Sequence, residues 1–234
     1  MKKNLKKEFI AATLLGALIT PCIIFTTGCG MESQVQVATY EELVEAIKGD
    51  KSVVCLTEDI DLQEQIVVNR KVKIDLNGKT ISVTNDIWNE DTSVWSVISV
   101  RENGDATITG EGKIQTKEND SYCIDVMAGG KLIIENGEFI GNISSVYAYE
   151  GDVLIKGGTY SIQQLSSEYG YRLTINLYDV KRREEKANIK ISGGEFKNFD
   201  PSNPMEEGYK LLEEGYESKL VEGSTTDYIV TKIA

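Results

Sequence analysis

The stretch Asn188 to Asp200, NIKISGGEFKNFD, combines a short alternating strand, a glycine pair and an aromatic residue that begins a second strand. Alternation of apolar and polar residues that ends at glycines is typical of short strands joined by tight corners. The same phrase recurs four times earlier in the chain, as KVKIDLNGKTI (71–81), ATITGEGKI (106–114), KLIIENGEF (131–139) and DVLIKGGTY (152–160). The chain is therefore built from repeats.

Each repeat is expected to contain three short strands. Two lie on either side of the glycines, and a further apolar run precedes every copy except the first. Three strands per repeat with no helical period between them indicate a coiled solenoid rather than a sandwich. Coils stacked about 4.8 Å apart would pair each strand with its equivalent in the next coil. We expect one inward ladder of Ile74, Ile108, Ile134, Ile155 and Ile191, and a second of Ile81, Ile114, Phe139, Tyr160 and Phe196.

This pattern over residues 39 to 200 resembles the right-handed parallel β-helix of the pectin-lyase-like proteins. The resemblance rests on the repeat and not on a catalytic motif. It implies an all-β fold of about five coils with three strands each. We expect a helix from Thr39 to Gly49, opened by the capping box TYEE and followed by strands, as in the first part of pectin-lyase-like domains. It would cover the N-terminal end of the coils.

The C-terminal segment 201–234 predicts a second cap. Asn203 before Pro204 favours the start of a short helix over residues 205 to 214. Tyr216 to Val221 and Asp227 to Lys232 would pair as a hairpin around GSTT. The mixed charge run 179–187, DVKRREEKA, predicts a solvated loop.

Residues 1 to 28 have the arrangement of an export signal, with a basic start (MKKNLKK) and an apolar run from Phe9 to Phe25. Gly28-Cys29 followed by a polar stretch resembles a bacterial lipoprotein signal, which implies that Cys29 becomes lipidated and that residues 29–38 form a tether. Thr26 and Pro21 depart from that pattern, so plain secretion and an uncleaved membrane anchor stay open as alternatives. We expect an exported protein anchored to the bacterial cell envelope.

Composition excludes several classes of function. The net charge of −12 makes nucleic acid an unfavourable partner. Histidine is absent, which removes Ser-His-Asp and Cys-His catalysis and most zinc sites. Cys55 and Cys123 would lie on different ladders, too far apart for a disulfide. Acidic side chains of the first coil would suit Ca²⁺, but a solvated corner is the simpler interpretation; they are Glu58, Asp59 and Asp61.

Two long insertions leave the same corner of the coil, between Ile81 and Ile98 and between Tyr160 and Ile175. They carry aromatic residues, and the strand SVYAYEG between them would turn two more tyrosines outward. Together these six residues would line a groove for a glycan or a protein, because Tyr and Trp combine apolar faces with polar groups. The candidate binding residues are Trp88, Trp95, Tyr147, Tyr149, Tyr169 and Tyr171. The alternative is that the loop aromatics fold back and pack against the coil.

A catalytic site is not indicated by the outward charges. Asp75, Asp125 and Arg172 would fall on different ladders, and Asp125 with Glu150 only loosely meets the carboxylate spacing of an inverting glycosidase. We therefore expect a non-enzymatic binding protein without a cofactor or metal. A structural or assembly role without a ligand site is one alternative, and a polysaccharide lyase or hydrolase is another. The sequence is compatible with an oligomer.

Overall fold

The structure is a computed structural model that describes residues 33–89, 91–118, 121–165, 173–204 and 209–234. The export signal and Cys29 lie outside these residues. The described strands form three sheets, in which most neighbouring strands come from successive repeats of the sequence. All pairs are parallel except those of the C-terminal hairpin. This arrangement is consistent with a parallel β-helix and confirms the expected parallel stacking.

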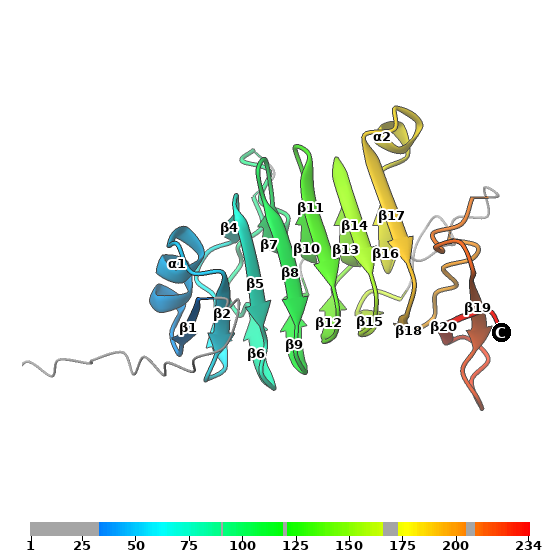
Figure 1. Cartoon of the computed structure of the whole chain (residues 1–234), viewed down its shortest axis with the longest axis horizontal. Coiled ribbons are helices and arrows are strands. Elements are labelled where there is room, and N and C mark those ends of the chain that lie inside the picture. Colours follow the sequence, from blue (N-terminus) through cyan, green and yellow to red (C-terminus); the bar gives the residue numbers. More distant parts are fainter. Residues whose placement is uncertain (1–32, 90, 119–120, 166–172, 205–208) are drawn as a thin grey trace, which may run out of the picture. The chain divides into compact units, whose positions relative to one another are not determined.

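Sheet A is the seven-stranded sheet whose strands lie side by side in Figure 1. Its order is β1 (Gln34–Val37), β2 (Val53–Leu56), β5 (Lys71–Asp75), β8 (Asp105–Thr109), β11 (Gly130–Ile134), β14 (Gly151–Ile155) and β17 (Ala187–Ile191). The expected isoleucine ladder is present: Ile74 pairs with Ile108, and the register continues through Ile134, Ile155 and Ile191. All five side chains are fully buried.

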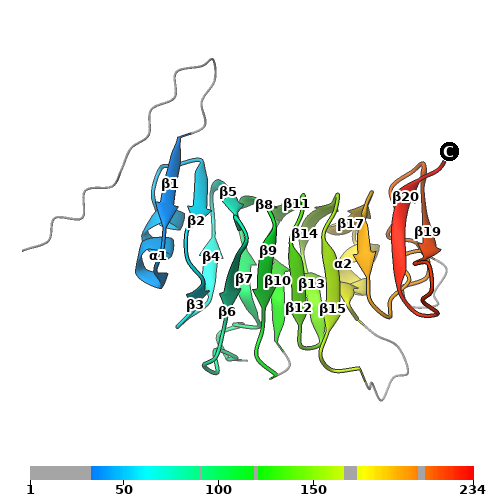
Figure 2. The same ribbon diagram turned by 90° about the horizontal axis from the view of Figure 1, so that it is seen from below.

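Sheet B, seen from below in Figure 2, has eight strands. Its order is β3 (Ile60–Asp61), β6 (Lys79–Ser82), β9 (Gly112–Gln115), β12 (Glu138–Gly141), β15 (Thr159–Ile162), β18 (Gly194–Phe196), β20 (Tyr228–Lys232) and β19 (Tyr216–Leu220). The second expected ladder runs through it from Ile81 to Phe196. Its last three rungs are stacked aromatic rings, with centroids 5.1 Å apart for Phe139 and Tyr160 and 4.9 Å apart for Tyr160 and Phe196.

Sheet C has five strands. Its strands, in spatial order, are β16 (Ile175–Leu177), β13 (Ser144–Ala148), β10 (Tyr122–Val126), β7 (Ser96–Val100) and β4 (Ile66–Val68). Ile98, Ile124, Val146 and Ile175 stack toward the interior. The three sheets therefore enclose one aliphatic and aromatic core.

The corner between sheets A and B explains the recurring glycines. Gly194 has φ of 108°, a conformation that glycine adopts without steric cost. A Cβ atom on Gly193 would lie 2.2 Å from the carbonyl oxygen of Lys156 in the preceding repeat. The glycine pair thus allows the backbones of successive corners to approach closely.

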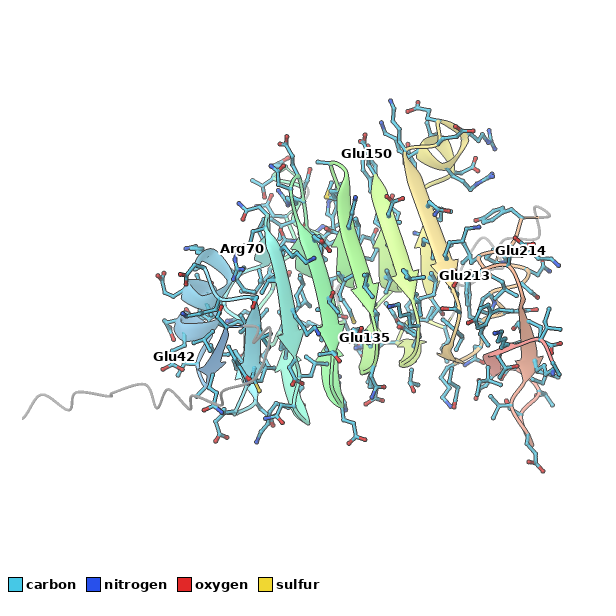
Figure 3. All side chains as sticks on the ribbon, in the orientation of Figure 1. Glu42, Arg70, Glu135, Glu150, Glu213 and Glu214 are labelled. Atoms are coloured by element: carbon cyan, nitrogen blue, oxygen red, sulfur yellow. The ribbon has the colours of Figure 1, made fainter. Side chains whose placement is uncertain are left out.

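The N-terminal cap is the helix α1 (Tyr40–Lys48), as expected. Thr39 Oγ1 accepts a hydrogen bond from the Glu42 amide, and the Glu42 carboxylate accepts one from Ala38. Leu43, Ala46 and Ile47 form the buried face of the helix. At its other end the Arg70 guanidinium donates to the carbonyls of Ala46 and Ile47; Figure 3 shows this arginine beside the helix.

Three local expectations were wrong. Residues 34–37, assigned to the tether, form β1, because their alternating valines allow pairing with β2 and bury Val37. Residues 209–214 are not helical: Leu211 and Glu213 instead hydrogen-bond with Ile191, so that pairing at the edge of β17 outweighs helix propensity. Residues 179–183 form the short helix α2 (Asp179–Arg183) instead of a loop, since Asp179 pairs with both of its arginines. The C-terminal hairpin of β19 and β20 is present as expected.

Candidate functional site

The candidate site is a cluster of aromatic rings on the outer face of sheet C. Four segments supply it: the insertion between β6 and β7, the strand β10, the strand β13 with the turn after it, and the residue that precedes α2. Both long insertions connect sheet B to sheet C, so they leave the same corner, as expected. We call this group of rings the aromatic cluster; its described members are Trp88, Trp95, Tyr122, Tyr147, Tyr149 and Tyr178.

The rings contact one another in a continuous series. Trp88 meets Tyr122 edge-on with centroids 6.4 Å apart, and Tyr122 lies 5.0 Å from Tyr147. Tyr147 meets Tyr149 at 6.1 Å, and Trp95 also reaches Tyr149 at 6.1 Å. Edge-to-face and offset contacts at these distances are the favoured aromatic geometries. The structure therefore brings together the four predicted residues that it describes; Tyr169 and Tyr171 lie outside the described residues.

Tyr147 does not present an open ring face, contrary to expectation. Its side chain does lie on the outer side of sheet C, but only 9% of the residue is exposed. Burial raises the pKa of its hydroxyl well above the ordinary value, and neighbouring tyrosines and Asp125 add to the effect. The other cluster members are partly exposed. Tyr147 therefore lies under the other rings of the cluster, and those rings form its accessible part.

Sequence reasoning missed two members of the cluster. Tyr178 stacks on Tyr149 with centroids 4.8 Å apart and an interplanar angle of 10°. Tyr122 lies between Trp88 and Tyr147. Alternation gave no signal for Tyr122, because a period of two places it on the same inward side as Ile124, although it begins the strand that pairs with the one carrying Tyr147. Tyr178 could be found only if the start of α2 were known. No sign of that start was present in the sequence, because the mixed charge run 179–187 predicted a loop.

The insertion that carries the two tryptophans is held in place by polar contacts. The backbones of Asn89 and Val94 exchange two hydrogen bonds of 2.9 Å, which close its tip. Arg101, just after β7, donates to the carbonyl of Ser93 at 3.3 Å and to the side chain of Gln65 at 3.0 Å. Trp88 and Trp95 are thereby fixed on the outer face of sheet C.

Beneath the rings lies a buried polar network centred on Asp125, the register partner of both Ser99 and Tyr147. Its carboxylate contacts Ser99 Oγ at 2.5 Å and Ser96 Oγ at 2.9 Å, and the residue is fully buried. The Arg101 Nε atom donates to Ser99 Oγ at 2.9 Å, so the guanidinium reaches Asp125 through the serine. Burial raises the pKa of Asp125 to about 6, although both serine contacts and Arg101 act against the shift.

The side of the cluster next to α2 is charged but locally balanced. Lys181 lies 3.4 Å from Glu150, which follows Tyr149, and 3.5 Å from Glu184. Figure 3 shows Glu150 at the edge of the sheets on which α2 lies. Because Glu150 is paired and Asp125 is enclosed, the two carboxylates do not form an open pair around a substrate.

Among the described residues, no group of three or more Cys, Asp or Glu side chains is placed to hold a metal ion. Cys55 and Cys123 are buried free thiols, as expected. None of the helices in the described ranges is long and apolar enough to span a bilayer.

No family model, curated protein or solved structure matches this chain. Any functional conclusion therefore depends on the aromatic cluster and on the sequence itself.

Proposed function

We propose that this protein is a non-enzymatic, exported surface lipoprotein that binds carbohydrate through the aromatic cluster. In this proposal the body is a right-handed parallel β-helix of about five coils, similar to the pectin-lyase-like proteins, and it acts as a rigid support. The observation that carries the proposal is the continuous series of rings contributed by four separate segments, in which the partly exposed rings are joined through the buried Tyr147.

Carbohydrate is the favoured ligand class because of the chemistry of the rings. Sugar C–H faces pack on Tyr and Trp, and tyrosine hydroxyls supply hydrogen bonds at the rim. The net charge of −12 disfavours polyanionic partners. A protein ligand would use the same rings, since Tyr and Trp are enriched in protein interfaces. An enzyme acting on a polysaccharide is less well supported, because the carboxyl group with the raised pKa is buried under the cluster.

Binding is tested by replacing rings at the accessible part of the cluster. Trp95→Ala and Tyr149→Ala each remove one of two rings that touch at 6.1 Å, so each should weaken binding to the glycans recognised on an array about tenfold. Tyr228→Ala is the matched control, because Tyr228 is partly exposed on β20, outside the cluster. Equal losses in all three variants, or no glycan binding by the wild type, would contradict the proposal. In the second case, capture of a protein ligand that depends on Trp95 would favour the protein alternative.

The anchor is tested at Cys29. Lipidation requires its thiol, so Cys29→Ser should move the protein from the membrane fraction to the soluble or secreted fraction of the producing bacterium. The body should stay folded, because Cys29 precedes the first strand β1. Cys55→Ser changes a cysteine of the body and should leave the protein in the membrane fraction. Unchanged membrane association of Cys29→Ser would support an uncleaved anchor instead.

A further inference from the structure

The last strand of sheet B has an open edge. β19 pairs with β20 on one side, and no other described strand pairs with its far side. Its residues are partly or fully exposed. An exposed strand edge is a template for pairing with another chain.

The backbone hydrogen bonds show which groups face the open edge. The amide of Val221 donates to Asp227, and the amide of Ile233 donates to Gly215. In an antiparallel pair the hydrogen-bonded positions alternate, so residues 217 and 219 bond toward β20. The amide and carbonyl groups of Ser218 and Leu220 therefore point away from β20, toward the open edge.

The side chains of β19 are complementary to a second copy of the same strand. If two copies run antiparallel about a two-fold axis at Ser218, Glu217 of each copy lies opposite Lys219 of the other. In one chain these two side chains already share a face of the strand, with Lys219 Nζ and Glu217 Oε1 2.6 Å apart. Tyr216 then lies opposite Leu220 on the other face. Opposite charges directly across an antiparallel pair stabilise it, whereas like charges destabilise it.

Apolar side chains around this edge are exposed in the single chain. Leu220 is 50% exposed, Ile229 is 37% exposed and Ile233 is 54% exposed. A lysine on an edge strand ordinarily opposes pairing. Here the opposing effect disappears only for a partner that places a carboxylate opposite Lys219, which an antiparallel copy of β19 does.

We propose that the chain forms a two-fold dimer in which the β19 strands of two copies pair antiparallel, centred on Ser218. Sheet B then continues from one copy into the other. An isologous contact of this kind closes after two copies, so it does not extend into a fibre. The edge opposite β19, where sheet B ends at β3, takes no part in the contact.

The test is a charge exchange measured by sedimentation velocity on the full-length chain. A mild detergent prevents the apolar run 9–25 from driving association. The wild type is expected to approach twice the mass of one chain as concentration rises. Glu217→Lys places like charges at both cross-strand pairs, and so does Lys219→Glu, so each variant should raise the dimer dissociation constant about tenfold. An equimolar mixture of the two variants restores both opposite-charge pairs and should dimerise like the wild type.

Ser218→Pro is a second, independent variant. It removes an amide hydrogen that faces the open edge and leaves the bonds to β20 intact, so the hairpin should form while the dimer is lost. Thr225→Pro, in the exposed loop of the hairpin, is its control and should dimerise normally. A wild type that stays monomeric, single charge variants that dimerise normally, or a mixture that fails to recover would each overturn the proposal.

Discussion

Replacing Tyr160 by alanine is expected to lower the free energy of unfolding by about 3–5 kcal/mol, the usual range for removing a large aromatic side chain from a core. Tyr160 is fully buried, and its ring is stacked between Phe139 and Phe196. The substitution therefore opens a cavity and removes two ring contacts at once. Neighbouring strands cannot close this cavity easily, because their spacing is fixed by the parallel ladders on both sides.

Urea unfolding followed by circular dichroism measures this effect, and Tyr160→Phe is the matched control. The phenylalanine keeps the stack and loses only the hydroxyl, which donates to the Gly157 carbonyl at 2.7 Å. One such hydrogen bond contributes about 1 kcal/mol. If the phenylalanine variant lost as much stability as the alanine variant, the hydroxyl and not the ring stack would stabilise this part of the core.

Asp125 is expected to make the protein less stable as the pH rises from about 4 to about 6. Its pKa in the folded chain is raised to about 6, above the ordinary value of 3.8. The folded state then binds the proton more tightly than the unfolded state, so this contribution to stability is complete below the unfolded pKa and is lost as the pH passes the folded pKa. The difference in pKa corresponds to a loss on the order of 3 kcal/mol.

Burial, and not hydrogen bonding, raises the pKa of Asp125. Ser96 Oγ lies 2.9 Å from the Ile98 carbonyl, 2.9 Å from the Asp125 carboxyl and 3.0 Å from the Gln65 side-chain nitrogen. A hydroxyl has one hydrogen to donate. A hydrogen donated to the Asp125 carboxylate favours its charged form, so the contacts with Ser96 and Ser99 oppose the raised pKa and burial outweighs them.

Comparison with Asp125→Asn isolates this contribution from the other carboxylates, since the amide has nearly the same shape and does not titrate in this range. Unfolding free energies of both proteins at several values between pH 3.5 and pH 7.5 should show the asparagine variant gaining relative stability by about 3 kcal/mol as the pH rises. Asp152→Asn, an exposed change on β14, should follow the wild type. A constant difference between wild type and Asp125→Asn would show that this carboxyl has an ordinary pKa.

The core of the fold could be predicted from the sequence because its rules are local and repeated. A period of two assigns each isoleucine to a face, and glycines at a nearly constant offset mark the corners. The ladder from Ile74 to Ile191 follows directly from these rules. The ends of the fold do not repeat, which is why β1 and the extended pairing of Leu211 were missed.

The aromatic cluster was only partly predictable for a related reason. Alternation correctly placed the Tyr147 side chain on the outer side of its strand. It gave no information on what covers that side, and the neighbouring rings bury the residue. Tyr178 joins the cluster through the position of α2, a property of tertiary packing.

Because adjacent repeats have the same register, whole turns can be gained or lost as the sequence of such a chain evolves. Gly130 aligns with Gly151 as Ile134 aligns with Ile155, so one entire turn of backbone is interchangeable with the next at its junctions. Gain or loss of a turn would keep both terminal caps on surfaces they already fit. The molecule can therefore vary in length by whole increments, and the outer loops are free to diversify independently of that length.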